Sequence, residues 1–79
     1  MKITIKYCGI WGYKPRAQLV GDEILDRYPD IEVFLEVGEA GQFDIIYEDE
    51  DEITKLIYSK DKTNSFPEEG EIVRLLGEE

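Results

Sequence analysis

One stretch decides the fold of this 79-residue chain: KYCGIWGYKP, residues 6–15. The residues around its start alternate between apolar and polar, which predicts a strand from about Lys2 to Tyr7. Gly9 and Gly12 predict a loop, since glycine adopts backbone angles that other residues disfavour. Pro15 suits the first turn of a helix, where its missing N–H would have had no partner. The stretch therefore joins a strand to a helix through a short loop.

A helix and a second strand are predicted after the loop. From Pro15 to Tyr28 apolar residues recur at helical spacing. Gly21 lies on the same face, and we attribute it to a close approach between helix and sheet, because glycine within a helix costs about 1 kcal/mol. Residues 31–37, IEVFLEV, alternate as a strand does. A strand, a helix and a strand in this order predict a parallel, right-handed crossover.

Two more strands are predicted in the second half of the chain. They are QFDIIY, residues 42–47, and ITKLIYS, residues 53–59. The turns before and between them are short, so these strands should pair in the antiparallel direction.

The sequence ends in a predicted short helix. Ser65 and Glu68 have the spacing of a capping box, and Pro67 fits the first helical turn. The predicted order is β-α-β-β-β-α, an α/β fold with a mixed four-stranded sheet packed by two helices. Residues 1–79 are expected to form a single domain, because the chain is too short for two.

Acidic side chains dominate the composition. The chain has 19 acidic and 9 basic residues, which gives a formal net charge of −10. Because nucleic acids and anionic membranes are bound through Lys and Arg, we expect no nucleic-acid and no membrane partner. The run YEDEDE, residues 47–52, lacks the spacing of a calcium loop, so we expect a solvated hairpin turn there.

The sequence has no histidine and a single cysteine. These counts exclude an internal disulfide, a zinc site built from Cys and His, and a catalytic triad that uses imidazole. We therefore expect no metal and no bound cofactor. Nothing resembles a signal peptide or the roughly 20 apolar residues of a membrane span, so a cytoplasmic, reducing location is expected.

Cys8 is the candidate reactive group. It is predicted to lie at a strand end, a few residues before a helix N-terminus, whose unpaired N–H groups favour a thiolate. The positive charges of Lys6, Lys14 and Arg16, which are near in sequence, favour the thiolate as well. Both effects lower the thiol pKa. The alternative is a buried cysteine that acts only as a small apolar residue.

The cysteine region resembles a known family. YCGIWGYKPRA, residues 7–17, is similar to the selenoprotein W motif, in which Cys-Gly-x-Sec (or Cys) is followed by Gly-Tyr-Lys-Pro. Residues 31–47 and NSFPEEGEIVRLL, residues 64–76, agree with later landmarks of this family, also called Rdx. The resemblance implies a minimal thioredoxin-like fold and a small cytoplasmic thiol-redox protein linked to glutathione and to the thiols of partner proteins.

Trp11 is where the sequence departs from the family. Cys8 falls on the family's first cysteine, whereas Trp11 falls on the selenocysteine or second cysteine. An indole cannot form a disulfide, so a two-thiol cycle is excluded. Three explanations remain open. The ring is a platform for a ligand or partner, it fills space, or a one-base codon difference has replaced selenocysteine or cysteine by tryptophan.

Two functions fit this sequence. In the first, Cys8 alone performs glutathione-linked monothiol exchange, with glutathione as co-substrate and with Lys14 and Arg16 supporting the thiolate or a glutathione carboxylate. In the second, the protein is redox-inactive and the loop from Cys8 to Trp11, flanked by Tyr7 and Tyr13, is an aromatic contact surface for a protein partner. Retention of the only cysteine favours the first.

Overall fold

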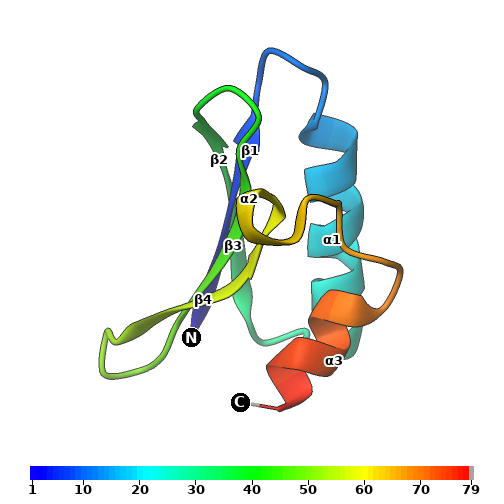
Figure 1. Cartoon of the computed structure of the whole chain (residues 1–79). Coiled ribbons are helices and arrows are strands. Elements are labelled where there is room, and N and C mark those ends of the chain that lie inside the picture. Colours follow the sequence, from blue (N-terminus) through cyan, green and yellow to red (C-terminus); the bar gives the residue numbers. More distant parts are fainter. Residues whose placement is uncertain (79) are drawn as a thin grey trace.

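A mixed four-stranded sheet forms the centre of the molecule (Figure 1). In the computed structural model, which describes residues 1–78, the strand order is β2-β1-β3-β4. The strand β1 (Lys2–Cys8) pairs in parallel with β2 (Glu32–Gly38) and antiparallel with β3 (Phe43–Glu48). The edge strand β4 (Thr54–Ser59) is antiparallel to β3. The expected strand directions are confirmed.

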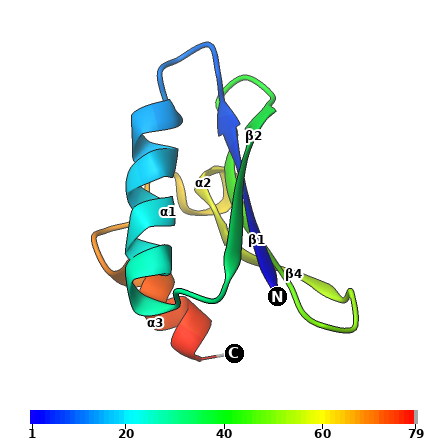
Figure 2. The ribbon, with the colours of Figure 1, turned by 180° about the vertical axis from the view of Figure 1, so that it is seen from behind.

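Two helices cover one face of this sheet, α1 (Lys14–Arg27) and α3 (Glu71–Gly77) (Figures 1 and 2). Between helices and sheet lies a core of apolar side chains that are almost fully buried because each strand alternates and each helix has one apolar face. Its central members are Ile3, Ile5, Ala17, Ile24, Phe43, Ile45 and Ile72. The opposite face of the sheet, which α1 and α3 leave uncovered, is called the open face below.

A third helix was not expected. The single turn α2 (Lys60–Thr63) follows β4 directly. The backbone N–H of Asn64 donates a hydrogen bond to the Lys60 carbonyl (2.7 Å), and Asn64 ends the turn with a left-handed φ of 62°. Asparagine tolerates this conformation better than most residues, so the local sequence explains the turn.

The predicted start of the last helix is wrong. Helix α3 begins at Glu71, after Gly70 with φ of 80°, and Ser65 is not its cap. The side chain of Glu71 instead accepts a hydrogen bond from the backbone N–H of Glu68 (2.9 Å). The physical reason lies in Phe66, whose ring packs against the core and holds the chain away from helical geometry before Gly70.

Gly21 faces the sheet, but the approach is looser than expected. A Cβ on Gly21 would lie 3.4 Å from Cγ1 of Val33, which is an ordinary van der Waals distance. The helix therefore has room for an alanine at this position.

Burial decreases along the edge strand β2 toward the loop that follows β1. Ile31, just before the strand, is buried, whereas Val37 near its end is 65% exposed. Strand β2 has a neighbour on one side only, so its apolar side chains depend on α1 for cover. Within residues 1–78, no helix is long and apolar enough to cross a membrane.

Candidate functional site

Cys8 is the last residue of β1, where the loop of residues 9–13 begins. Strand pairing places it opposite Gly38, and its N–H donates to the carbonyl of Gln42 (2.8 Å). Its side chain is a free thiol with no exposed surface. The backbone on both sides therefore fixes the sulfur beneath two turns, the 9–13 loop and the turn that joins β2 to β3.

Backbone N–H groups from these two turns converge on the sulfur. The N–H of Trp11 donates to Sγ of Cys8 at 3.4 Å. Burial raises the pKa of the thiol, but hydrogen bonds from the backbone of Gly41, Trp11 and Ile10 outweigh it, and the pKa of Cys8 is lowered. The direction agrees with the sequence-based expectation. The groups responsible belong to the backbone.

Two of the three nearby cations are engaged elsewhere. The guanidinium of Arg16 lies 4.7 Å from the centre of the Phe66 ring, in a cation–π contact. The ammonium of Lys6 lies 4.0 Å from Oε1 of Glu36. Lys14 is the exposed first residue of α1. Support of the thiolate or of glutathione by Lys14 and Arg16 stays a prediction.

Trp11 covers the turn between β2 and β3. Its indole lies against Gly41, where an added Cβ would come within 3.1 Å of the ring atom Cζ3. Gly41 has φ of 78°, so this turn requires glycine for its backbone as well as for space. The indole is 61% exposed, so it does not fill the core.

An aromatic ladder links the loop to the core. It consists of Trp11, Tyr13, Phe66 and Phe43, whose successive ring centres lie 6.2, 4.7 and 5.2 Å apart in edge-to-face contacts. Lys60 of α2 places its ammonium 5.4 Å from the Phe66 ring centre. Sequence reasoning missed Lys60 and the role of Phe66, although Phe-Pro at 66–67 was part of the family resemblance.

Exposed apolar side chains surround the buried thiol. Ile10, Trp11 and Val37 are 82, 61 and 65% exposed, and Gly9 lies against Val37. We call these three side chains the loop patch. The loop residues that the sequence singled out are thus brought together around Cys8, whereas Tyr7, expected to flank the contact surface, is buried in the core because it lies on the side of β1 that the helices cover.

A small acidic cavity of about 270 Å³ adjoins the turn that covers the sulfur. Glu39, Asp44 and Asp61 contribute carboxylates to its lining, together with Gly41 and Gln42. The amide of Gln42 donates to Oδ2 of Asp44 (2.9 Å), whereas the buried Oδ1 has no hydrogen-bond partner in the described structure. A ligand group that enters here has to be neutral or basic.

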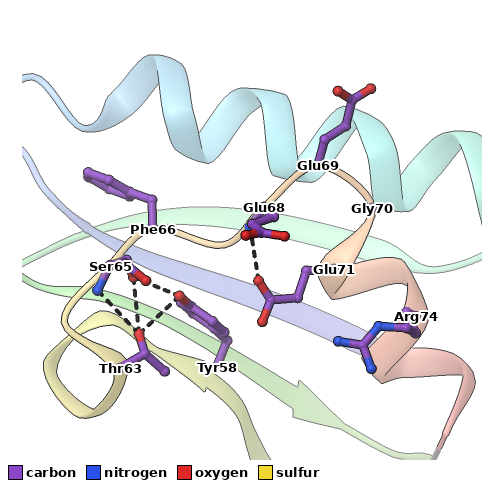
Figure 3. A pocket seen from close by; sticks show the side chains of 9 residues that line it. All are labelled: Tyr58, Thr63, Ser65, Phe66, Glu68, Glu69, Gly70, Glu71 and Arg74. Atoms are coloured by element: carbon purple, nitrogen blue, oxygen red, sulfur yellow. Dashed lines mark hydrogen bonds between the residues drawn. The ribbon is translucent and has the colours of Figure 1, made fainter.

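A larger cavity of about 510 Å³ lies beside α3 and contains no residue of the cysteine loop (Figure 3). The phenol of Tyr58 donates to the Ser65 carbonyl (2.6 Å), and the Thr63 hydroxyl donates to the phenol oxygen (2.9 Å). These bonds tie residues 63–65 to β4. We therefore assign a structural role to the polar side chains on this side of the cavity.

The acidic run after β3 closes a hairpin. Oδ1 of Asp49 accepts the N–H groups of Asp51 (2.9 Å) and Ile53 (3.0 Å). Within residues 1–78, no group of three or more Cys, Asp or Glu side chains is arranged to hold a metal ion.

Comparison with protein-family models matches residues 2–78 to the Rdx family. The chain belongs to the Rdx family. A search of curated proteins found no match. The selenoprotein W-like assignment made from the cysteine motif is confirmed.

Two solved structures resemble this Rdx protein. One is a selenoprotein W-related protein from Vibrio cholerae, 21% identical, with a TM-score of 0.82 over 98% of this chain and 92% of that chain. The other, from Bordetella parapertussis, is 23% identical, with a TM-score of 0.82 over 98% of this chain and 94% of that chain. The thioredoxin-like fold is confirmed, and membership of the family points to a thioredoxin-like, redox-related role.

Proposed function

We propose that this Rdx protein is a thiol-redox protein that works through Cys8 alone, by monothiol exchange linked to glutathione in the reducing cytoplasm. The observation that carries the proposal is the convergence of backbone N–H groups on the sulfur, which lowers the pKa of Cys8 although the thiol is buried. A lowered pKa matters because the thiolate, and not the thiol, attacks disulfides.

The exchange has two steps. The Cys8 thiolate attacks the glutathione sulfur of a protein–glutathione mixed disulfide, so that a Cys8–glutathione disulfide forms and the substrate protein leaves as a thiolate. A second glutathione thiolate then attacks that glutathione sulfur, releases the Cys8 thiolate and forms glutathione disulfide. The attacking glutathione thiolate is the reductant, because its sulfur is oxidised into glutathione disulfide while the sulfur of the substrate protein is reduced to a thiolate. No second thiol at position 11 is needed.

Access to the sulfur requires movement of the loop. Cys8 has no exposed surface, and the 9–13 loop and the Gly41 turn lie over it. Trp11 packs against the Gly41 turn, whereas Gly12 has open space around it and φ of 73°. We infer that displacement of the Trp11 ring opens the path to Sγ, and that the loop patch contacts the substrate.

The charges near the site favour a protein substrate with a neutral or basic surface. The carboxylates of Glu39, Asp44 and Asp61 line the adjoining cavity and would repel the carboxylates of glutathione there. Glutathione is therefore expected to approach from the side of α1, where Lys14 and Arg16 carry positive charge.

Alkylation of Cys8 measured by intact mass between pH 4 and 10 tests the thiolate. We expect a midpoint below the free-cysteine value of about 8.5. Trp11→Ala should speed alkylation, because it removes the ring that packs on the Gly41 turn over the sulfur. Ile53→Ala is the matched control, since Ile53 is an exposed apolar residue at the β3–β4 hairpin (63% exposed) and should leave the rate unchanged.

Transfer of glutathione from a mixed disulfide tests the reaction itself. Cys8→Ser should abolish transfer, and Lys14→Gln with Arg16→Gln should slow it. Unchanged transfer by Cys8→Ser, or an alkylation midpoint at or above the free-cysteine value, would contradict the proposal.

The exposure of the loop patch favours a second function, a redox-inactive contact surface for a protein partner. Aromatic and apolar side chains with more than half of their surface exposed are typical of such surfaces. Under this function, Trp11→Ala should abolish capture of the partner, whereas Cys8→Ser should leave it intact. The reverse pattern would support thiol exchange.

A further inference from the structure

The open face of the sheet carries an ordered pattern of side chains. Cross-strand pairing aligns them in three rows that run across the strands. Written in the strand order β2, β1, β3, β4, the first row is Glu32, Lys2, Glu48 and Thr54; the middle row is Phe34, Thr4, Ile46 and Leu56; the last row is Glu36, Lys6, Asp44 and Ser59. Three of the four side chains in the middle row are apolar, and charged side chains predominate in the two rows that flank it.

The middle row is accessible. Phe34 and Leu56, at its two ends, are 46 and 42% exposed, although both are large apolar residues. A helix on this face would bury them, but α1 and α3 both lie on the other side of the sheet (Figures 1 and 2). An apolar row rimmed by charges is typical of an interaction surface.

The pattern of charges on this face favours a second copy of this chain as the binding partner. Two copies can stack their open faces about a two-fold axis that runs parallel to the strands, midway between β1 and β3. In this arrangement β1 faces β3 of the second copy, so Lys2 lies opposite Glu48 of the second copy. The carboxylate of Asp44 takes no part in this contact, because its Oδ2 accepts from Gln42 and its Oδ1 is buried. In the middle row, Phe34 faces Leu56 of the second copy and Thr4 faces Ile46.

The ion pair between Lys2 and Glu48 within one copy adds to the charge complementarity between the two copies. The ammonium of Lys2 already lies 3.6 Å from Oε2 of Glu48 within one copy. The second copy adds its own Lys2 and Glu48 in the opposite order, which gives a square of alternating charges. Opposite charges placed in this way steer association and fix its geometry.

The other face-to-face symmetry is unfavourable. If the two-fold axis ran across the strands, each strand would face itself. Lys2 would then lie opposite Lys6 of the second copy, and Glu32 opposite Glu36. Like charges at these positions repel, so the pattern distinguishes the two arrangements.

We propose that the open face is a self-association surface, on which a second copy of this chain stacks with β1 against β3 to form a sheet-on-sheet homodimer. Stacked sheets lie about 10 Å apart and can cross at about 30°. One sheet face of this size offers several hundred Å² per copy, below the roughly 800 Å² of a stable interface, so we expect a weak dimer with Kd in the micromolar range or above.

Sedimentation equilibrium of the full chain up to about 1 mM, at physiological ionic strength, tests this proposal. The wild type should show a concentration-dependent dimer. Lys2→Glu and Glu48→Lys should each weaken it by at least about tenfold, because each places like charges opposite one another twice per dimer. Far-UV circular dichroism checks that both variants stay folded.

Mixing the two variants is the decisive step. In a 1:1 mixture, the heterodimer pairs Glu at position 2 with Lys at position 48 once and retains one native pair, so dimers should return. Glu48→Lys also reduces the net negative charge, so weaker association of this variant cannot come from general repulsion between acidic copies. Lys14→Glu, on α1 and away from the open face, is the control and should leave Kd within about twofold.

Three results would overturn the proposal. They are a monomer at every concentration, a dimer that neither variant weakens, and a mixture that stays monomeric. If Lys2→Glu strengthened association, the arrangement with β1 facing β1 would be the correct one and the proposed geometry would be wrong. None of these outcomes depends on the thiol chemistry of Cys8.

Discussion

The cysteine loop and the β3–β4 hairpin share one hydrogen-bonding arrangement at different places in the sheet. In each, backbone N–H groups of a turn converge on one side-chain atom, the sulfur of Cys8 or Oδ1 of Asp49. The sulfur is fully buried, whereas the hairpin bonds are exposed to water. The comparison indicates that the same arrangement closes a turn when the acceptor is an exposed carboxylate and tunes reactivity when it is a buried thiol.

The largest effect on stability is expected from Gly41→Ala, which alters the turn over Cys8. An alanine at φ of 78° is strained, and its Cβ would lie 3.1 Å from the Trp11 ring. We expect a loss of about 1–2 kcal/mol in the free energy of unfolding. Urea unfolding measures this loss. If the turn shifts, the alkylation midpoint of Cys8 should also rise, because the Gly41 N–H is one of the groups that lower the thiol pKa.

Asp49→Ala removes the acceptor that closes the β3–β4 hairpin. Two backbone N–H groups lose their acceptor at an exposed position, which should cost about 1 kcal/mol of stability. The alkylation midpoint of Cys8 should not change. Glu50→Ala removes a carboxylate from the adjacent residue and is the matched control. Equal destabilisation by both variants would show that net charge, and not the turn, is responsible.

Gly21→Ala should change the free energy of unfolding in the opposite direction from Gly41→Ala. Gly21 lies in α1, where a Cβ has an ordinary contact at 3.4 Å, so alanine fits. We expect stabilisation by about 0.5–1 kcal/mol, since alanine favours the helix. A destabilised variant in urea unfolding would mean that the helix has to approach the sheet more closely than this contact indicates.

The smallest effect is the pH dependence of stability contributed by Cys8. Because its pKa is lowered in the folded protein, ionisation stabilises the fold above the unfolded-chain pKa of about 8.5. This contribution is lost as the pH falls through the folded pKa. The stability difference between wild type and Cys8→Ser should therefore grow as pH rises between these two values. A difference that shrinks over this window in urea unfolding would mean that burial dominates the thiol pKa.

The order of strands and of the two covering helices could be predicted from sequence because each element has its own periodicity. Residues 31–37 alternate, and Pro15 marks the helix start. The start of α3 could not be predicted in the same way. The local pattern at Ser65 and Glu68 fits a helix cap, but the packing of Phe66 overrides it.

The candidate site could be located from sequence but not explained. Cys8 was identified through its loop and the family motif. The groups that the sequence predicts to lower its pKa are the N–H groups of the helix N-terminus and the charges of Lys6, Lys14 and Arg16, because these are near Cys8 along the chain. A backbone N–H from Gly41, which is 33 residues away in the chain, becomes a neighbour only through the pairing of β1 with β2 and β3.

The exposed indole of Trp11 gives this protein an internal optical probe. Trp11 is the only tryptophan in the chain, and its backbone N–H donates to the sulfur of Cys8. Its emission therefore comes from one known place, beside the group that is proposed to react. Attachment of glutathione to Cys8 would have to displace the ring from the Gly41 turn, so each turnover would change the fluorescence without any added label.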